Sequence, residues 1–230
     1  MIIGLIGAMD EEIAYLKNNM DVDYEETIAN CLFIKGQLQG KVIVLLKSGI
    51  GKVNAALATS ILMERFNPDL VINTGSAGGL DTELEIGDVV IANEVVHHDV
   101  DVTAFNYQYG QVPGMPASYT AASTLMAVIE RMIKEHKQVN CKQGIIATGD
   151  SFMTNPERVA LVKERIPNVM AVEMEAAAIA QVCYQYDKPF AIIRSLSDIA
   201  GKQSSISFDA YLKQAARHAA ELIIAVVNEL

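Results

Sequence analysis

The feature that most constrains the fold is a repeated alternation of short apolar runs with amphipathic segments. Apolar, β-branched runs such as Met1–Gly7 and Leu70–Thr74 are typical of strands buried on both faces. Apolar residues recur three or four positions apart in the neighbouring segments Met9–Asn19 and Lys52–Phe66, and this spacing predicts helices. Strands that alternate with helices favour an α/β fold. We therefore expect three layers, α/β/α, around a central twisted sheet that is mixed but mostly parallel.

The remaining segments continue this alternation, and no repeat or linker interrupts it, so we expect a single domain over residues 1–230. Further strands are predicted at Cys31–Leu38, Lys41–Lys47, Val89–Val95, Gly144–Thr148, Val169–Val172 and Phe190–Ser195. Further helices are predicted at Leu125–Ile133, Pro156–Ile166, Glu175–Tyr186 and Phe208–Leu230. The segment His97–Tyr119 has no periodicity and predicts a long loop, of the kind that is often functional. Gly75–Gly79 is expected to form a turn.

One helical face can be marked in advance. Val53, Leu57 and Ile61 recur at a spacing of four within Lys52–Phe66 and therefore share one face of that helix.

The charge of the chain excludes several classes of partner. The net charge is −10 and the basic residues form no run, so we expect no nucleic-acid partner, which would require a basic surface. A neutral or zwitterionic small molecule suits an acidic protein better than a phosphate-bearing one does. The apolar runs are shorter than the ~20 residues that cross a bilayer, so no membrane association is expected.

The cysteines and histidines favour no metal site, and no cofactor is expected. Cys31, Cys141 and Cys183 lie far apart, so neither a disulfide scaffold nor a zinc site is predicted, and free thiols suit a reducing compartment. His97-His98 lacks a third ligand at a convincing spacing. The N-terminal segment turns acidic at once and has no basic region of a signal peptide. We expect a cytoplasmic protein.

Polar residues gather where the predicted strands end. They are Asp10-Glu11-Glu12, Ser76, Asp150, Glu173 with Glu175, and Arg194 with Asp198. Ligands of α/β proteins bind at the carboxyl ends of strands, so we expect these distant segments to converge on one site.

Each acidic cluster also has a purely structural interpretation. Acids in the first turn of a helix favour its dipole, which accounts for Asp10 and Glu11 and leaves Glu12 evenly balanced between structure and function. One of Glu173 and Glu175 is explained as a helix cap, and the other is expected to bind ligand hydroxyls, which donate to carboxylates.

The last cluster and the long loop leave two interpretations open. Arg194 and Asp198 form either an ion pair with a cap or a site in which Asp198 keeps a proton and acts as a general acid. The aromatic and proline residues at positions 105–113 either pack the loop or form an apolar wall for a ligand.

Taken together, seven segments resemble one family in order and spacing, from Met1 to about the last helix. They are GLIGAMDEE, KSGIGKVNAA, NTGSAGGL, DVTAF, Gly149-Asp150-Ser151-Phe152, AVEMEAAAIA and Ser195-Leu196-Ser197-Asp198. The family is that of the 5′-methylthioadenosine/S-adenosylhomocysteine nucleosidases, in the superfamily of nucleoside phosphorylases. The VEMEA segment and the later Ser-Asp pair also occur in purine nucleoside phosphorylases and do not discriminate between the two.

The resemblance implies hydrolysis of the N-glycosidic bond of 5′-methylthioadenosine and S-adenosylhomocysteine, and also of 5′-deoxyadenosine, without a cofactor. It implies that Glu12 activates water, that Glu175 binds the ribose hydroxyls above Met174, and that Asp198 protonates adenine. The other substrate-binding residues that it implies are Met9, Ile50, Ser76, Ala77, Gly78, Phe152, Met153, Arg194, Ser197 and Phe208. A homodimer is implied as well, in which Val102, Phe105 and Pro113 complete the 5′ pocket of the second subunit.

The residues themselves favour hydrolysis over phosphorolysis. A phosphorolytic site must hold an anion, usually with arginines, whereas the first strand end carries Asp10, Glu11 and Glu12 and only Arg194 lies at a candidate site. The alternatives are a phosphate-dependent purine nucleoside phosphorylase and a non-catalytic nucleoside-binding module. Retention of Glu12, Glu175 and Asp198 argues against the second alternative.

Overall fold

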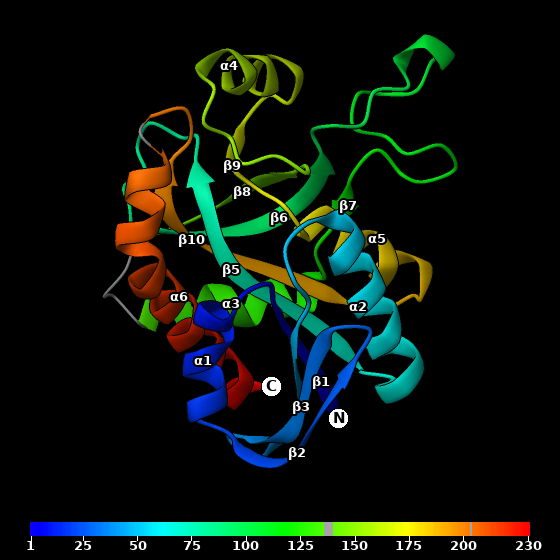
Figure 1. Ribbon diagram of the computed structural model, residues 1–230, viewed down its shortest axis with the longest axis vertical. Helices are drawn as coiled ribbons and strands as arrows, with labels where there is room; N and C mark the ends of the chain where they lie inside the picture. The colour runs from blue at the N-terminus through cyan, green and yellow to red at the C-terminus, as the bar shows by residue number, and fades with distance from the viewer. Residues whose placement is uncertain (136–139, 203) are drawn as a thin grey trace.

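The computed structural model describes residues 1–135, 140–202 and 204–230 and has the expected three layers (Figure 1). Helices α1 (Asp10–Asn18), α3 (Ser123–Glu135) and α6 (Ser204–Glu229) pack together on one face of the sheet. Helices α2 (Lys52–Phe66) and α5 (Ala176–Gln185) pack together on the other face. Helix α4 (Pro156–Arg165) lies beyond the ends of β8 and β9 (Figure 1).

The strands between these helices form one mixed sheet. They are β1 (Ile2–Gly7), β2 (Asp21–Ile28), β3 (Cys31–Leu38), β4 (Lys41–Lys47), β5 (Leu70–Gly79), β6 (Val89–His97), β7 (Tyr119–Thr120), β8 (Cys141–Thr148), β9 (Val169–Glu173) and β10 (Phe190–Ile199). Their order is β10-β6-β8-β9-β5-β1-β4-β3-β2, and β7 pairs with β6. The pairs β1–β4, β1–β5, β5–β10, β6–β8 and β8–β9 are parallel.

Strand β5 closes part of this sheet on itself. It pairs with β10 in parallel along most of its length, and at Gly78 and Gly79 it also pairs with β9 in antiparallel register. The strands β5, β10, β6, β8 and β9 therefore form a ring. Because β9 runs against β5, this closure brings the carboxyl ends of β8 and β9 next to those of β1, β5 and β10.

Two neighbouring strands of the ring, β5 and β10, are buried almost throughout. Every residue of β5 is buried, and so is every residue of β10 except the last. Both strands nevertheless carry polar side chains, among them Ser76, Arg194 and Asp198. Polar groups are costly to bury unless they are hydrogen-bonded, so these side chains must find partners inside the protein.

Two local predictions need correction, and one strand was not predicted. Gly75–Gly79 does not form a turn, because Gly78 and Gly79 pair with strands on both sides and β5 continues to Gly79. Strand β10 likewise extends past Ser195 to Ile199. The strand Asp21–Ile28 was not predicted, because it is a mostly exposed edge strand rich in acidic residues and lacks a buried face.

The apolar face of α2 that the spacing marked is not the face that packs on the sheet. Val53 is 77% exposed and Leu57 is 43% exposed. The buried face consists mostly of smaller side chains and includes Ala55, Ala58 and Leu62. Leu62 and Met63 are the large side chains of this buried face, whereas Val53 and Leu57 remain on the surface.

The aperiodic segment between β6 and β7 is a long loop, as expected, with one short 3₁₀ helix at Thr103–Phe105. It extends away from the rest of the molecule (green in Figure 1), and the Phe105 side chain is 74% exposed. Among the described residues, no helix combines the length and the apolar character that a bilayer span needs.

Candidate active site

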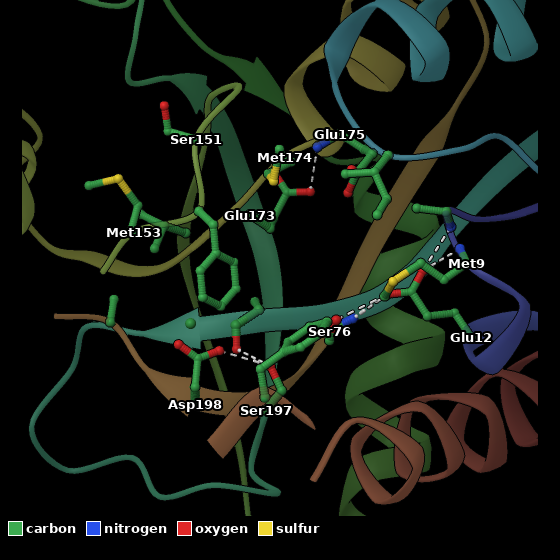
Figure 2. Close-up of a pocket in the computed structure, with 18 residues that line it drawn as sticks. Met9, Glu12, Ser76, Ser151, Met153, Glu173, Met174, Glu175, Ser197 and Asp198 are labelled. Atoms are coloured by element: carbon green, nitrogen blue, oxygen red, sulfur yellow. Dashed lines mark hydrogen bonds between the residues drawn. The ribbon is translucent and has the colours of Figure 1, made fainter. Parts of the chain in front are cut away.

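A cavity of about 350 Å³ opens where the ends of β1, β4, β5, β8, β9 and β10 meet. Its carboxylates come from segments far apart in the sequence, namely Glu12, Glu173, Glu175 and Asp198. Figure 2 shows Glu12 beside Met9 at one end of the pocket and Asp198 at the other, along β5. A ligand held between them therefore has a carboxyl group at each end.

Glu12 is held by four hydrogen bonds and is 2% exposed. Its Oε2 accepts from the backbone N–H groups of Ala8 (2.7 Å) and Met9 (3.2 Å), which caps the start of α1. Its Oε1 accepts from the backbone N–H of Ser76 (2.9 Å) and from the Ser76 hydroxyl (3.1 Å). Glu12 is thus both a helix cap and a fixed acceptor in the pocket wall. Its neighbours Asp10 and Glu11 are exposed.

Glu173 is the second helix cap of the site. Its Oε2 accepts from the backbone N–H groups of Glu175 (2.9 Å) and Ala176 (2.8 Å) at the start of α5. Its Oε1 accepts from the Thr148 hydroxyl, whose oxygen in turn accepts from Ala177 N–H. Of the two acids in this segment, Glu173 is therefore the cap, and Glu175 is free to face the ligand.

Arg194 lies fully buried behind these carboxylates. Its Nη2 pairs with Glu173 and lies 3.7 Å from Glu175 Oε2. Burial disfavours the charge, but the charges of Glu173, Glu175 and Glu12 outweigh it and raise the pKa of Arg194 above its usual value. A Cβ on Gly75 would lie 2.0 Å from Arg194 Nη1, so this position has room only for glycine.

The carboxyl group of Glu175 is an unusually weak acid. Burial, with the charges of Glu173 and Glu12, raises the pKa of Glu175 to about 8, although Arg194 and the hydrogen bond from Gly51 N–H (2.8 Å) oppose the shift. Glu175 is therefore mostly protonated at neutral pH in the free protein. A ligand that donates hydrogen bonds to it would favour the charged form.

Asp198 is placed by a β-bulge in β10. The register with β5 shifts between Leu196 and Asp198, and as a result the adjacent Ser197 and Asp198 both line the pocket. The Ser197 hydroxyl donates to Asp198 Oδ1 (2.9 Å) (Figure 2). A Cβ on Gly78 would lie 3.1 Å from Asp198 Oδ2, so a side chain at position 78 would crowd this carboxyl.

The rest of the pocket wall is apolar. Phe152 and Phe208 meet edge to face with ring centroids 5.5 Å apart. The thioethers of Met9, Met153 and Met174 line the same cavity. Flat aromatic surfaces and soft sulfur atoms suit a planar base and a thioether group.

The structure brings nearly all of the predicted site residues to one cavity. The thirteen that line it are Met9, Glu12, Ile50, Ser76, Ala77, Gly78, Phe152, Met153, Met174, Glu175, Ser197, Asp198 and Phe208. The lining residues that the sequence did not single out as ligand-binding are Ala8, Ser151, Val172, Glu173 and Ala200. Ser151 stands next to Phe152 in the predicted segment, and that position was the only available signal for it.

Four predicted residues do not line the cavity. Arg194 is not among the lining residues, because its guanidinium is enclosed by Thr74 O, Asn73 Oδ1 and Glu173 beneath the wall. The loop residues Val102, Phe105 and Pro113 also lie outside the pocket of their own chain. The described side chains include no group of three or more His, Cys, Asp or Glu residues placed to hold a metal ion.

Comparison with known proteins defines the class. The sequence model of the phosphorylase superfamily matches residues 2–228, so the chain is a member of this superfamily. A 5′-methylthioadenosine/S-adenosylhomocysteine nucleosidase from Geobacillus sp. (strain WCH70) is 58% identical over 100% of this chain and 99% of its own.

Solved structures agree with the sequence match. The nucleosidase of the same name from Neisseria meningitidis, in complex with methylthio-immucillin-A, has a TM-score of 0.97 and 46% identity over 100% of this chain and 99% of its own. The one from Colwellia psychrerythraea, in complex with adenine, has a TM-score of 0.97 and 47% identity over 100% and 96%. The chain belongs to the family of 5′-methylthioadenosine/S-adenosylhomocysteine nucleosidases.

The acidity of Glu175 gives a testable dependence of stability on pH. Between its ordinary pKa of 4.5 and about 8, the folded protein keeps a proton that the unfolded chain has released. Stability therefore falls as pH rises through this window. Glu175→Gln removes this contribution while keeping an acceptor for Gly51 N–H. We expect the Tm of Glu175→Gln to gain on that of the wild type steadily from pH 5 to pH 8 in thermal unfolding.

The matched control is Glu11→Gln on the exposed side of α1. It should follow the wild-type curve at each pH. A constant difference in Tm between Glu175→Gln and wild type across this range would contradict the assigned acidity.

Proposed function

We propose that this protein hydrolyses the N-glycosidic bond of 5′-methylthioadenosine and S-adenosylhomocysteine, and also of 5′-deoxyadenosine, and releases adenine. The observation that carries the proposal is the placement of Glu12 and Asp198 at opposite ends of one pocket, with Glu175 between them. The apolar wall at Met9 and Phe208 suits an uncharged 5′ group. The relatives' names and the ligands methylthio-immucillin-A and adenine support the same substrates.

The reaction exchanges one bond to the anomeric carbon for another. Cleavage of the bond from C1′ to N9 leaves the electron pair on adenine and positive charge on the ribose, which nearby carboxylates stabilise. Asp198 protonates N7 of the departing base, and Glu12 accepts a proton from the water whose oxygen bonds to C1′. Glu175 accepts hydrogen bonds from the ribose hydroxyls. We infer that Arg194 acts behind the wall by keeping Glu173 and Glu175 in place.

The charge of the pocket favours water over phosphate as the nucleophile. The described residues that line the cavity include no Lys or Arg, but they include four carboxyl groups, those of Glu12, Glu173, Glu175 and Asp198. A phosphate ion would meet carboxylates without the arginine donors that phosphoryl groups usually require. This argument disfavours the phosphorylase alternative, and the relatives' name, nucleosidase, disfavours a mere nucleoside-binding module.

The first experiment is an assay of adenine release from 5′-methylthioadenosine in phosphate-free buffer and again with phosphate added. Hydrolysis predicts the same rate in both buffers and free 5-methylthioribose as the sugar product, identified by mass. A rate that depends on phosphate, with a sugar 1-phosphate as the product, would establish a phosphorylase instead.

Substitution of the two terminal carboxyl groups tests their roles. Glu12→Gln and Asp198→Asn should each lower kcat by about 10²–10⁴-fold, since each removes a proton-transfer group, with a much smaller effect on KM. Asp10→Asn is the matched control, because Asp10 is exposed and pairs with Lys47 outside the pocket. A kcat near that of wild type in Glu12→Gln would remove Glu12 from the mechanism.

We also propose a homodimer in which Val102, Phe105 and Pro113 complete the neighbour's pocket. Two exposed apolar surfaces support it, the α2 face with Val53 and the loop with Phe105, which are 77% and 74% exposed. Large apolar side chains that gather on a surface usually mark an interface. We further infer a cytoplasmic location, since the three cysteines are free thiols.

The dimer proposal makes a prediction for α2. Val53→Lys with Leu57→Lys should yield a monomer in light scattering and raise KM for 5′-methylthioadenosine by about tenfold, since lysines at an apolar interface oppose association. Val22→Lys on the edge strand β2 is the control and should remain dimeric. A wild-type protein that is an active monomer would refute the shared pocket.

A further inference from the structure

Two loops that line the pocket, after β4 and β8, are joined to the loop after β6 at a cluster of charged residues outside the pocket. The cluster consists of Lys52 at the start of α2, Asp99 after β6 and Asp150 after β8, and is called the Asp99 clamp below. Lys52 Nζ donates to Asp99 Oδ1 (2.5 Å), and the backbone N–H of Asp150 donates to Asp99 Oδ2 (2.9 Å). The backbone N–H of Lys52 donates to Asp150 Oδ1 (2.7 Å).

The clamp differs from an ordinary surface ion pair. The Lys52 and Asp99 side chains are only 20% and 25% exposed. Burial works against the charge of Asp99, but the hydrogen bonds from Lys52 and Asp150 and the charge of Lys52 outweigh it, so the pKa of Asp99 lies below its usual value. Because both carboxylate oxygens are engaged and one partner is backbone, the geometry is fixed in a way that exposed pairs of flexible side chains are not.

One arm of the clamp leads to Glu175. Lys52 follows Gly51, whose backbone N–H donates to Glu175 Oε1 (2.8 Å). Gly51 has a φ of +96°, and a Cβ there would lie 3.0 Å from Asp150 Oδ1, so the loop is in close contact with the clamp at this residue. The clamp therefore sets the direction of the N–H group that holds the pocket carboxyl.

The other arm leads to the aromatic wall. Asp150 directly precedes Ser151 and Phe152, both of which line the pocket. Phe152 is 42% exposed and packs edge to face against Phe208, so the position of the ring depends in part on its own backbone. The bond from Asp150 N–H to Asp99 anchors that backbone two residues before the ring.

We propose that Asp99 is a positioning residue for substrate binding, which aligns Phe152 and the Gly51 N–H through Asp150 and Lys52 without lining the pocket itself. This inference rests on the proposed function, in which Phe152 contacts the base and Glu175 the ribose. Both contacts exist in the ground state as well as in the transition state. A fault in the clamp therefore weakens binding more than it slows the chemical step.

The test is Asp99→Asn, which keeps the shape of the side chain and removes its charge. Loss of a charge-assisted hydrogen bond should raise the adenine Kd and the KM for 5′-methylthioadenosine by about tenfold, with a smaller change in kcat. The weakened Gly51 bond should also move the pH midpoint of substrate binding upward, because that bond helps to lower the pKa of Glu175. The charges that face Glu175, namely Glu173, Glu12 and Arg194, stay unchanged.

Three further variants complete the test. Lys52→Met breaks the same pair from its other side and should reproduce the effect, whereas Lys52→Arg keeps the charge and should restore most of the binding. Asp81→Asn is the matched control, because it breaks the half-buried pair of Asp81 with Lys142, neither of which lines the pocket, so it should bind adenine as the wild type does.

A purely structural role for Asp99 predicts a different result. Asp99→Asn and Lys52→Met would then lower Tm while KM, the adenine Kd and the pH profile stayed at wild-type values, and this result would overturn the proposal. If Asp99→Asn does not fold, Lys52→Met decides by the same measurements. Failure of the proposed function is seen separately, in wild-type protein that neither cleaves 5′-methylthioadenosine nor binds adenine.

Discussion

The rest of the site depends on one buried cation. Arg194 is fully enclosed between β5, β9 and β10, with its guanidinium bonded to Glu173, Asn73 and the carbonyl of Thr74. Without it, Glu12, Glu173 and Glu175 would place three carboxyl groups around a single cavity whose described lining includes no Lys or Arg. A buried charge of this kind is costly unless it is paired, so Arg194 and the carboxylates stabilise one another, and removal of either would leave the other uncompensated.

This arrangement separates the buried cation from the carboxylates that face the cavity. The positive charge of Arg194 lies beneath the pocket wall, and the carboxylates reach the cavity, where Glu12 and Asp198 lie at opposite ends. Glycine at position 75 leaves the space that Arg194 and Glu12 share. A pocket with this charge favours water and a developing cation on the ribose, and it disfavours a phosphate anion.

Local sequence predicted most of the elements, for identifiable reasons, whereas most of the lining residues came from the resemblance to a family. Buried strands such as β1 and β5 are continuous apolar runs, and these patterns depend only on neighbours in the chain. The edge strand β2 escaped prediction because its residues are mostly exposed. The Val53 and Leu57 face of α2 has helical spacing but is exposed, because periodicity marks a face without saying what covers it.

By itself, the sequence determined the α/β alternation, the polar residues at the strand ends and the likeness of seven motifs to one family. Tertiary structure alone decided that Glu173 caps α5 while Glu175 faces the cavity, and that Arg194 lies behind the wall. It also decided that Asp99 joins the loops after β4 and β8. The physical reason is that the spacing of residues along the chain fixes local geometry, whereas these roles follow from the closure of β5 onto both β9 and β10, a contact between segments about a hundred residues apart.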